Sequence, residues 1–180
     1  MKNGRRVVIT GVGAVTPLAN NVSDSWTRLI AGESGIGPIT RFDASALSTR
    51  IAGEVRGFDA HIYMDKKTAR RTDLFTQYAV AATHMAIEDS MLVVDEATAS
   101  RTGVILGSVM GGIGTLCHSI SSIDQGSFEG VSKMMASMYI PSAGANDISV
   151  AFGLKGPSRG ISTACATGTP TQQDPECGDG

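Results

Sequence analysis

The stretch that decides the fold is Gly156-Pro-Ser-Arg-Gly-Ile-Ser-Thr-Ala-Cys-Ala-Thr-Gly168. Small and β-branched residues lead into Cys165, and small residues follow it. The pattern predicts a buried strand over 161–164 that stops at a cysteine on the first turn of a helix. A helix N-terminus offers unpaired N–H groups and positive dipole, which favour a thiolate. The small neighbours leave room for an acyl group to approach the sulfur, although most free cysteines are simply buried in cores.

Outward from this stretch, apolar runs of strand length alternate with runs of helical period, which indicates an α/β fold. Buried strands are predicted at 7–10 and 104–106, and a shorter strand at 50–55 within a loop that extends from Glu33 to about Lys66. The strongest predicted helix is 73–91. Three further helices are predicted. One starts after an N-cap at Ser23 and ends at Gly32. Another leads from the bend at 111–114 to about Asp124, and the last spans 142–152 before Gly153.

Bulk composition excludes several classes of protein. The chain has 180 residues, 42% of them hydrophobic, with a net charge of −2, which gives no indication of nucleic-acid binding. No apolar run is long enough to span a bilayer. The three cysteines have the spacing of neither a disulfide framework nor a metal site. The pair Cys117-His118 alone provides too few ligands to hold a metal, so no metal or cofactor is expected. A cytoplasmic protein is the natural prediction.

Four collinear motifs resemble those of the β-ketoacyl-[acyl carrier protein] synthases, in the form typical of the type II enzymes. The nucleophile segment corresponds to 163–168 after Gly156-Pro157, and the resemblance covers roughly residues 5–169. The other motifs are the opening strand and turn at 6–18, the helix with Lys67 and 70–79, and the strand with its glycines at 103–112. The resemblance implies a thiolase-like fold, of which residues 1–169 form the N-terminal half, with a central mixed sheet flanked by helices.

The resemblance also implies roles for individual residues. Cys165 accepts an acyl group from the phosphopantetheine thioester of acyl carrier protein. The chain length of that group is set beside Met110, Gly111 and Gly112. The second methionine-rich patch, Met134, Met135 and Met138, is consistent with lining the same acyl pocket or that of the partner subunit. Basic residues contact the acidic carrier, and they correspond to Lys67, Arg70 and Arg71.

Each of these assignments has an alternative from the residues alone. Met110 and the methionines at 134–138 are also consistent with ordinary core packing. The basic residues Lys66, Lys67, Arg70 and Arg71 are also consistent with a solvated helix start. Gly11-Val-Gly13 after a strand suggests dinucleotide binding, but the third glycine of that fingerprint is absent and Thr16-Pro17 stands there, so a nucleotide-binding module is disfavoured.

The expected function is decarboxylative condensation of an acyl thioester with malonyl-carrier in fatty acid biosynthesis, by a homodimeric acyltransferase. The resemblance assigns two catalytic histidines, a lysine and a glycine-rich loop to a second half, and none of the three histidines here matches them. We therefore expect this chain to be inactive alone. The alternative is a non-catalytic module that only pairs with a complete subunit, and a polyketide pathway stays open. Residues 170–180, rich in proline and glycine, read as a disordered, divergent tail, for which a shifted reading frame near codon 169 is our preferred explanation.

Overall fold

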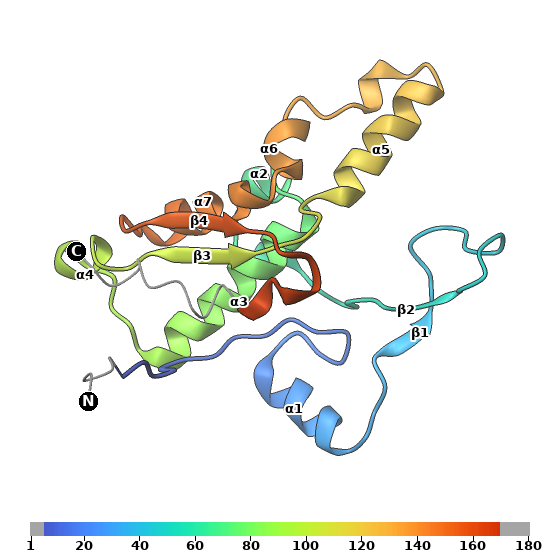
Figure 1. Cartoon of the computed structure of the whole chain (residues 1–180). Helices are drawn as coiled ribbons and strands as arrows, with labels where there is room; N and C mark the ends of the chain where they lie inside the picture. The colour runs from blue at the N-terminus through green and yellow to red at the C-terminus, as the bar shows by residue number, and fades with distance from the viewer. Residues whose placement is uncertain (1–5, 170–180) are drawn as a thin grey trace. The chain divides into compact units, whose positions relative to one another are not determined.

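A computed structural model describes residues 6–169 (Figure 1). The chain divides into two units, each with its own internal contacts. The first extends to Asp59 and includes Ala81–Leu92, and the second consists of Ala60–Val80 and the residues from Val93 onward. The tail predicted for 170–180 lies outside the described residues.

The first unit contains a helix and a hairpin. Helix α1 (Val22–Ile30) begins after Asn21, whose side chain accepts the backbone N–H of Asp24, so the predicted N-cap, Ser23, is wrong by two residues. Gly32 has a φ of +74° and ends the helix as predicted. Strands β1 (Ile36–Pro38) and β2 (Ile51–Gly53) pair antiparallel. The strand predicted at 50–55 is therefore confirmed, whereas β1 was not predicted, because two of its three residues, Gly37 and Pro38, are of types that strands disfavour.

Residues 7–10 do not form the predicted buried strand. Val7 is 87% exposed and Ile9 is 85% exposed. A strand requires a hydrogen-bonded neighbour, and this run has none among the described residues. The glycines that follow are explained by packing, because a Cβ on Gly11 or Gly13 would collide with a backbone carbonyl of helix α3 (Leu74–Ser90).

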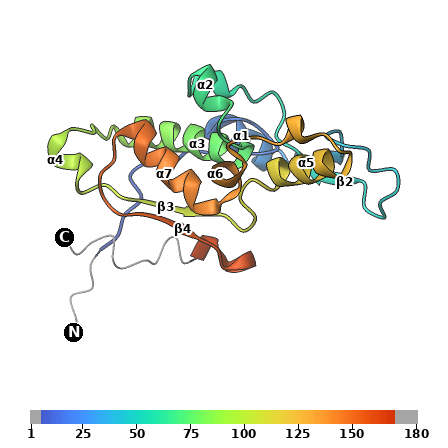
Figure 2. The ribbon, with the colours of Figure 1, turned by 90° about the horizontal axis from the view of Figure 1, so that it is seen from above.

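The second unit is built around a pair of parallel strands. Strands β3 (Val104–Gly107) and β4 (Ser158–Ile161) lie side by side and point the same way (Figure 1), in a register from Val104↔Ser158 to Gly107↔Ile161. Helix α7 (Pro141–Phe152) directly precedes β4 in the order of elements and packs against both strands (Figure 2). The remaining elements are η1 (Ala60–Ile62), α2 (Lys66–Ala69), the start of α3, α4 (Glu96–Ala99), α5 (Ile113–Asp124), η2 (Phe128–Gly130), α6 (Met135–Tyr139) and η3 (Ala164–Ala166).

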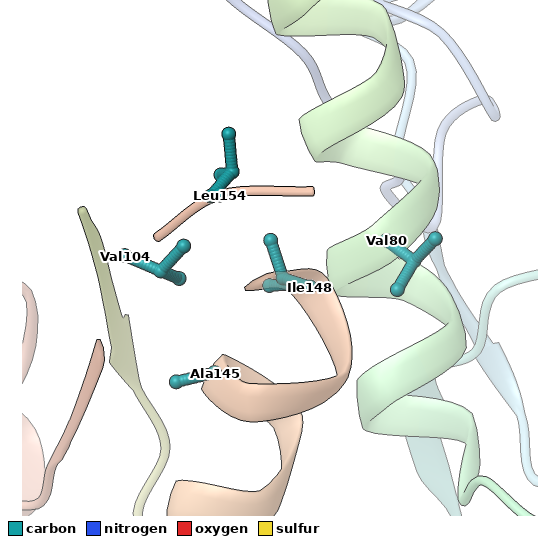
Figure 3. Close-up of a cluster of buried hydrophobic side chains, with 5 residues drawn as sticks. All are labelled: Val80, Val104, Ala145, Ile148 and Leu154. Carbon is teal, nitrogen blue, oxygen red and sulfur yellow. The ribbon is translucent and has the colours of Figure 1, made fainter. Parts of the chain in front are cut away.

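The core of this unit lies between α7, α3 and the strand pair. Its buried side chains are Val80, Val104, Ala145, Ile148 and Leu154 (Figure 3). Gly144 of α7 lets the helix approach the strands closely, because a Cβ there would meet the Leu106 and Phe75 side chains at less than 3 Å. The packing of α7 in this core thus holds the strand pair, and with it the carboxyl ends of β3 and β4, in place.

Most predicted elements of this unit are confirmed: the helices at 73–91, 111–124 and 142–152 and the strand at 104–106. The strand predicted over 161–164 is wrong in position and burial. It spans Ser158–Ile161, and its first three residues are exposed, because it pairs with β3 alone among the described strands. Its position is set by register with β3, where Val104 N–H donates to Pro157 O, rather than by local hydrophobicity.

Candidate active site

The carboxyl ends of β3 and β4 bring two predicted site segments to one sheet edge. Ligand sites of parallel α/β sheets lie at such edges. The loop 108–112 follows β3, and the Cys165 segment follows β4. Ser108 N–H donates to Ile161 O at 3.0 Å, and Ser162 Oγ donates to Val109 O at 3.4 Å. The predicted acyl-pocket loop and the predicted nucleophile therefore leave the sheet as neighbours.

Cys165 is an exposed, free thiol in the middle of η3. The cysteine predicted on the first turn of an α-helix lies instead on the 3₁₀ turn η3, which leads through Thr167 into the helical residues 168–169. The turn is closed by Ala166 N–H on Thr163 O and by Thr167 N–H on Ala164 O, both at 3.1 Å. Ala164 has a φ of +50°, the left-handed region that residues with a Cβ rarely occupy.

Thr167 stabilises this strained turn and was not predicted. The residue is 7% exposed. Its Oγ accepts the Thr163 N–H at 2.9 Å and donates to Ala164 O at 2.6 Å. One buried hydroxyl thus ties the residues on both sides of the left-handed Ala164, immediately beside the thiol. The only sequence signal was a threonine two positions after the cysteine.

The acyl-pocket loop is held closely against α6. Gly111 N–H donates to Ser108 Oγ at 3.1 Å, and Gly112 N–H donates to Tyr139 O at 3.0 Å. A Cβ on Gly111 or Gly112 would collide with a carbonyl oxygen of Tyr139 or Met138, and Gly111 has a φ of +55°. The two glycines are therefore required by close backbone approach.

Methionines surround this loop. Met110 is 52% exposed and is therefore not a core residue of the described chain. Met135 is half-buried at the start of α6, and Met134, before it, is 41% exposed. Met138 is half-buried, and its sulfur accepts from Ser132 Oγ at 3.5 Å. Met110 and Met134 are thus exposed and Met135 and Met138 half-buried, so none of the four is a buried core residue of the described chain.

The predicted carrier-binding residues lie together on α2 and the turn after it. A surface hollow is lined by Lys66, Lys67, Arg70 and Arg71. All four side chains are exposed, and none forms an ion pair within residues 6–169. Asp65 caps α2, and the hydrogen bond from the Thr68 side chain, with backbone N–H groups of α2, lowers the pKa of this carboxyl. The cluster therefore presents four exposed cations on an ordered turn, beside the Asp65 carboxylate.

Other functional groups are scattered. His84 is half-exposed, with Nδ1 at 3.4 Å from a carboxylate oxygen of Glu88. Across residues 6–169, no group of three or more His, Cys, Asp and Glu side chains is arranged to hold a metal ion. Within the same residues, no helix combines the length and apolarity required to cross a membrane.

Comparison with known proteins agrees with this arrangement. Residues 4–171 match the family model of the β-ketoacyl synthase N-terminal domain. The chain is 44% identical over 164 residues to 3-oxoacyl-[acyl-carrier-protein] synthase 2 of Coxiella burnetii, which covers 91% of this chain and 40% of that protein. It thus spans about 40% of the length of the curated relatives it matches.

Solved structures show the same fold. The ishigamide ketosynthase/chain length factor superposes with a TM-score of 0.78 at 26% identity, over 89% of this chain and 40% of that one. A type II polyketide acyl-carrier protein in complex with its ketosynthase matches with a TM-score of 0.76 at 25% identity, over 94% and 45% of the two chains. With its parallel strand pair, its glycine loop and its exposed cysteine, this chain belongs to the β-ketoacyl synthase family and has the thiolase-like fold of the N-terminal domain.

Proposed function

We propose that this chain supplies the acyl-accepting part of a fatty acid condensing enzyme, with Cys165 as the residue that is acylated. The observation that carries the proposal is the exposed thiol on a strained turn at the edge of β3 and β4, beside the loop of Met110, Gly111 and Gly112. A nucleophile requires access, and a pocket wall has to stand next to it. The exposed thiol supports the first condition, and the adjacency of the loop to the Cys165 segment supports the second.

In the proposed step, Cys165 Sγ, as thiolate, attacks the carbonyl carbon of a carrier thioester. A new C–S bond forms at Cys165, the old thioester C–S bond breaks, and the carrier leaves as a thiolate that takes up a proton. The oxyanion of the intermediate requires N–H donors. The N–H groups of Ala166 and Thr167 are used within the turn, whereas no described group accepts the N–H of Cys165, which makes it the available donor.

The basic residues Lys67, Arg70 and Arg71 are proposed to dock acyl carrier protein. They are exposed and form no ion pair within residues 6–169, and an acidic carrier would complement them. The similarity to a ketosynthase solved in complex with its acyl-carrier protein supports this assignment.

Condensation requires stabilisation of the carbanion that forms when malonyl-carrier loses CO₂. The family resemblance gives this role to two histidines of the second half of the fold. Since the chain spans about 40% of its relatives' length, we propose that it accepts an acyl group but does not condense it alone. Homodimer formation and a cytoplasmic location are part of the same proposal. Light scattering of the purified chain will test the dimer.

Peptide-level mass spectrometry tests the acylation. The chain is incubated with an acyl-carrier thioester, and the acyl group is located by digestion. We expect it on Cys165, not on the equally exposed Cys117 of α5, and we expect no transfer to the Cys165→Ala variant. Absence of acyl transfer to Cys165 would favour a non-catalytic module that pairs with a complete subunit, and turnover of malonyl-carrier by the chain alone would contradict the proposed division of labour.

Charge reversal tests the docking surface separately. Lys67→Glu with Arg71→Glu should raise the carrier-thioester concentration needed for half-maximal acylation. It should leave acylation by an acyl-pantetheine thioester, which has no acidic protein part, unchanged. Arg101→Glu, an exposed cation elsewhere in the same unit, is the matched control. An equal effect on acylation by the carrier thioester and by the pantetheine thioester would show that these cations do not dock the carrier.

A further inference from the structure

One carboxylate, Asp73, contacts the starts of two helices that are far apart in the sequence. It precedes α3, where its Oδ1 accepts the Phe75 N–H at 3.4 Å and its backbone carbonyl accepts the Gln77 N–H at 3.1 Å. Its Oδ2 accepts the Thr115 N–H at 3.1 Å and also the Thr115 hydroxyl. Asp73 therefore caps α3 locally and α5 from a distance of 42 residues.

Helix α5 needs this external cap. Its own N-cap residue is Gly112, which has no side chain and makes no side-chain capping hydrogen bond. The first N–H groups of a helix have no intrahelical acceptor and are normally satisfied by a polar N-cap side chain. Asp73 performs this role, and its negative charge also complements the helix dipole.

The same contact places the acyl-pocket loop. An added Cβ on Gly112 would lie 3.0 Å from Asp73 Cβ, so Gly112 is seated directly against the aspartate. Gly112 also donates to Tyr139 O, and the other end of the loop is fixed to β4 through Ser108. Met110 stands between these two attachments. Loss of the Asp73 contact would release one of them.

The basic turn is attached to the same point. Gln77 Nε2 donates to Ala69 O at 2.9 Å and to Thr72 O at 3.0 Å, and Thr72 Oγ donates to Thr68 O at 3.0 Å. These bonds hold α2 and the turn after it on the start of α3, where Asp73 lies. The carrier-facing cations and the acyl-pocket loop thus share a single ordered connection.

We propose that Asp73 is a positioning residue for acyl selection: it fixes Gly112 and the start of α5, and thereby sets where Met110 stands in the acyl pocket. The proposal rests on the proposed function, because the role of Met110 comes from it. Asp73 touches neither the thiol nor the acyl group in this account. It acts through the loop.

The test uses Asp73→Asn in the whole chain. In an asparagine an NH₂ group replaces one carboxylate oxygen and the negative charge is lost, so one of the bonds to the Phe75 and Thr115 N–H groups disappears and the other weakens. Hydrogen exchange of the 111–116 backbone amides should become about tenfold faster, because the charge-assisted hydrogen bond to the Thr115 N–H is weakened or lost there. Asp89→Asn is the matched control: this carboxylate, also on α3, accepts the Val12 N–H at 2.9 Å in the other unit, and its loss should leave 111–116 unchanged.

Acyl selectivity is the readout that a merely structural role would not move. The ratio of Cys165 acylation by palmitoyl-pantetheine to that by hexanoyl-pantetheine should change about tenfold in Asp73→Asn, the size of a one-methylene misfit in a pocket. Alkylation of Cys165 by iodoacetamide should stay at the wild-type rate. Thr115→Val should produce a smaller change of the same sign, and Thr115→Ser, which keeps the hydroxyl donor, should restore the wild-type ratio.

The outcomes separate the two proposals. Unchanged exchange at 111–116, or faster exchange with an unchanged acylation ratio, would overturn the role of Asp73. If Asp73→Asn loosens the entire chain, the Thr115 variants decide, and wild-type behaviour of Thr115→Val would overturn the role. Failure of both thioesters to acylate the wild-type chain would overturn the proposed function and acyl selection with it, whatever the exchange shows.

Discussion

Removal of the Thr167 hydroxyl should strongly reduce the reactivity of Cys165 toward acyl thioesters. Thr167→Val keeps the shape of the side chain but removes both hydrogen bonds of Oγ, one from the Thr163 N–H and one to Ala164 O. Those bonds hold Ala164 in the left-handed region next to the thiol.

The magnitude follows from the two bonds and the strain. Each neutral hydrogen bond contributes about 0.5–1.5 kcal/mol, so about 1–3 kcal/mol is lost when both disappear. A left-handed residue with a Cβ costs about 1–2 kcal/mol, and without the hydroxyl the turn is free to relax. If the reactive geometry becomes less populated by about 1.4–2 kcal/mol, acylation of Cys165 slows by about 10- to 30-fold.

Site-resolved mass spectrometry of Cys165 against time measures this rate. Thr167→Ser, which retains the hydroxyl, should recover most of the wild-type rate. Thr163→Val is the matched control, because the Thr163 side chain makes no capping bond in the described chain, and it should react normally. A wild-type rate in Thr167→Val, or equal losses in Thr167→Val and Thr163→Val, would refute the reasoning.

Three further predictions concern stability. Ile148 lies in the core at 3% exposure, so Ile148→Ala should lower the free energy of unfolding in urea by about 2–5 kcal/mol. Val150 is 83% exposed on the same helix, so Val150→Ala should change it by less than about 0.5 kcal/mol, and similar losses in both variants would disprove the core assignment. Gly153→Ala should cost about 1 kcal/mol in the same assay, because φ is +67° and no atom lies near an added Cβ, and a stabilised variant would contradict that backbone. The hydrogen bond from the Thr40 hydroxyl is the chief cause of the lowered pKa of Glu54. As the pH falls, this carboxyl is therefore protonated at a higher pH in the unfolded chain than in the folded chain. The stabilisation present at neutral pH is lost as the pH falls below about 4.3 toward the lowered pKa. Glu54→Gln should flatten the urea midpoint between pH 6 and pH 3, and an unchanged slope would exclude this carboxyl as its source.

The elements that could be predicted from the sequence are those whose signals are local. Helix α3 was predicted within one residue at each end, because apolar side chains recur with helical period over its length. Helix α7 ends at Gly153, which adopts the left-handed conformation that a glycine stop allows. These features depend on neighbours in the sequence and not on the rest of the fold.

Strand positions were less predictable because they depend on partners. Residues 7–10 are as apolar as β3 but find no neighbouring strand among the described residues, so their side chains are exposed. Strand β4 begins at Ser158 because its register with Val104 is fixed at Pro157, three residues before the hydrophobic run suggested. Sequence patterns report burial and carry little information on register.

The candidate site divides in the same way. Cys165 and the glycines of the loop could be singled out by residue type, although the cysteine lies on a 3₁₀ turn and not on an α-helix. Thr167 and Asp73 could not, because their roles arise from hydrogen bonds formed only in the folded chain. A signal for Asp73 did exist: a helix whose N-cap is Gly112 has to obtain its cap from elsewhere.

The most direct test is the distribution of acyl groups, within one sample, between Cys165 and Cys117, which are both exposed among the described residues. The wild-type chain is incubated with a limiting acyl-carrier thioester, and the acylated fractions of Cys165 and Cys117 are quantified from their peptides. The account predicts acylation almost entirely at Cys165, since only this thiol lies on the strained turn beside the acyl-pocket loop. Equal acylation of the two cysteines, or acylation of Cys117 alone, would contradict it.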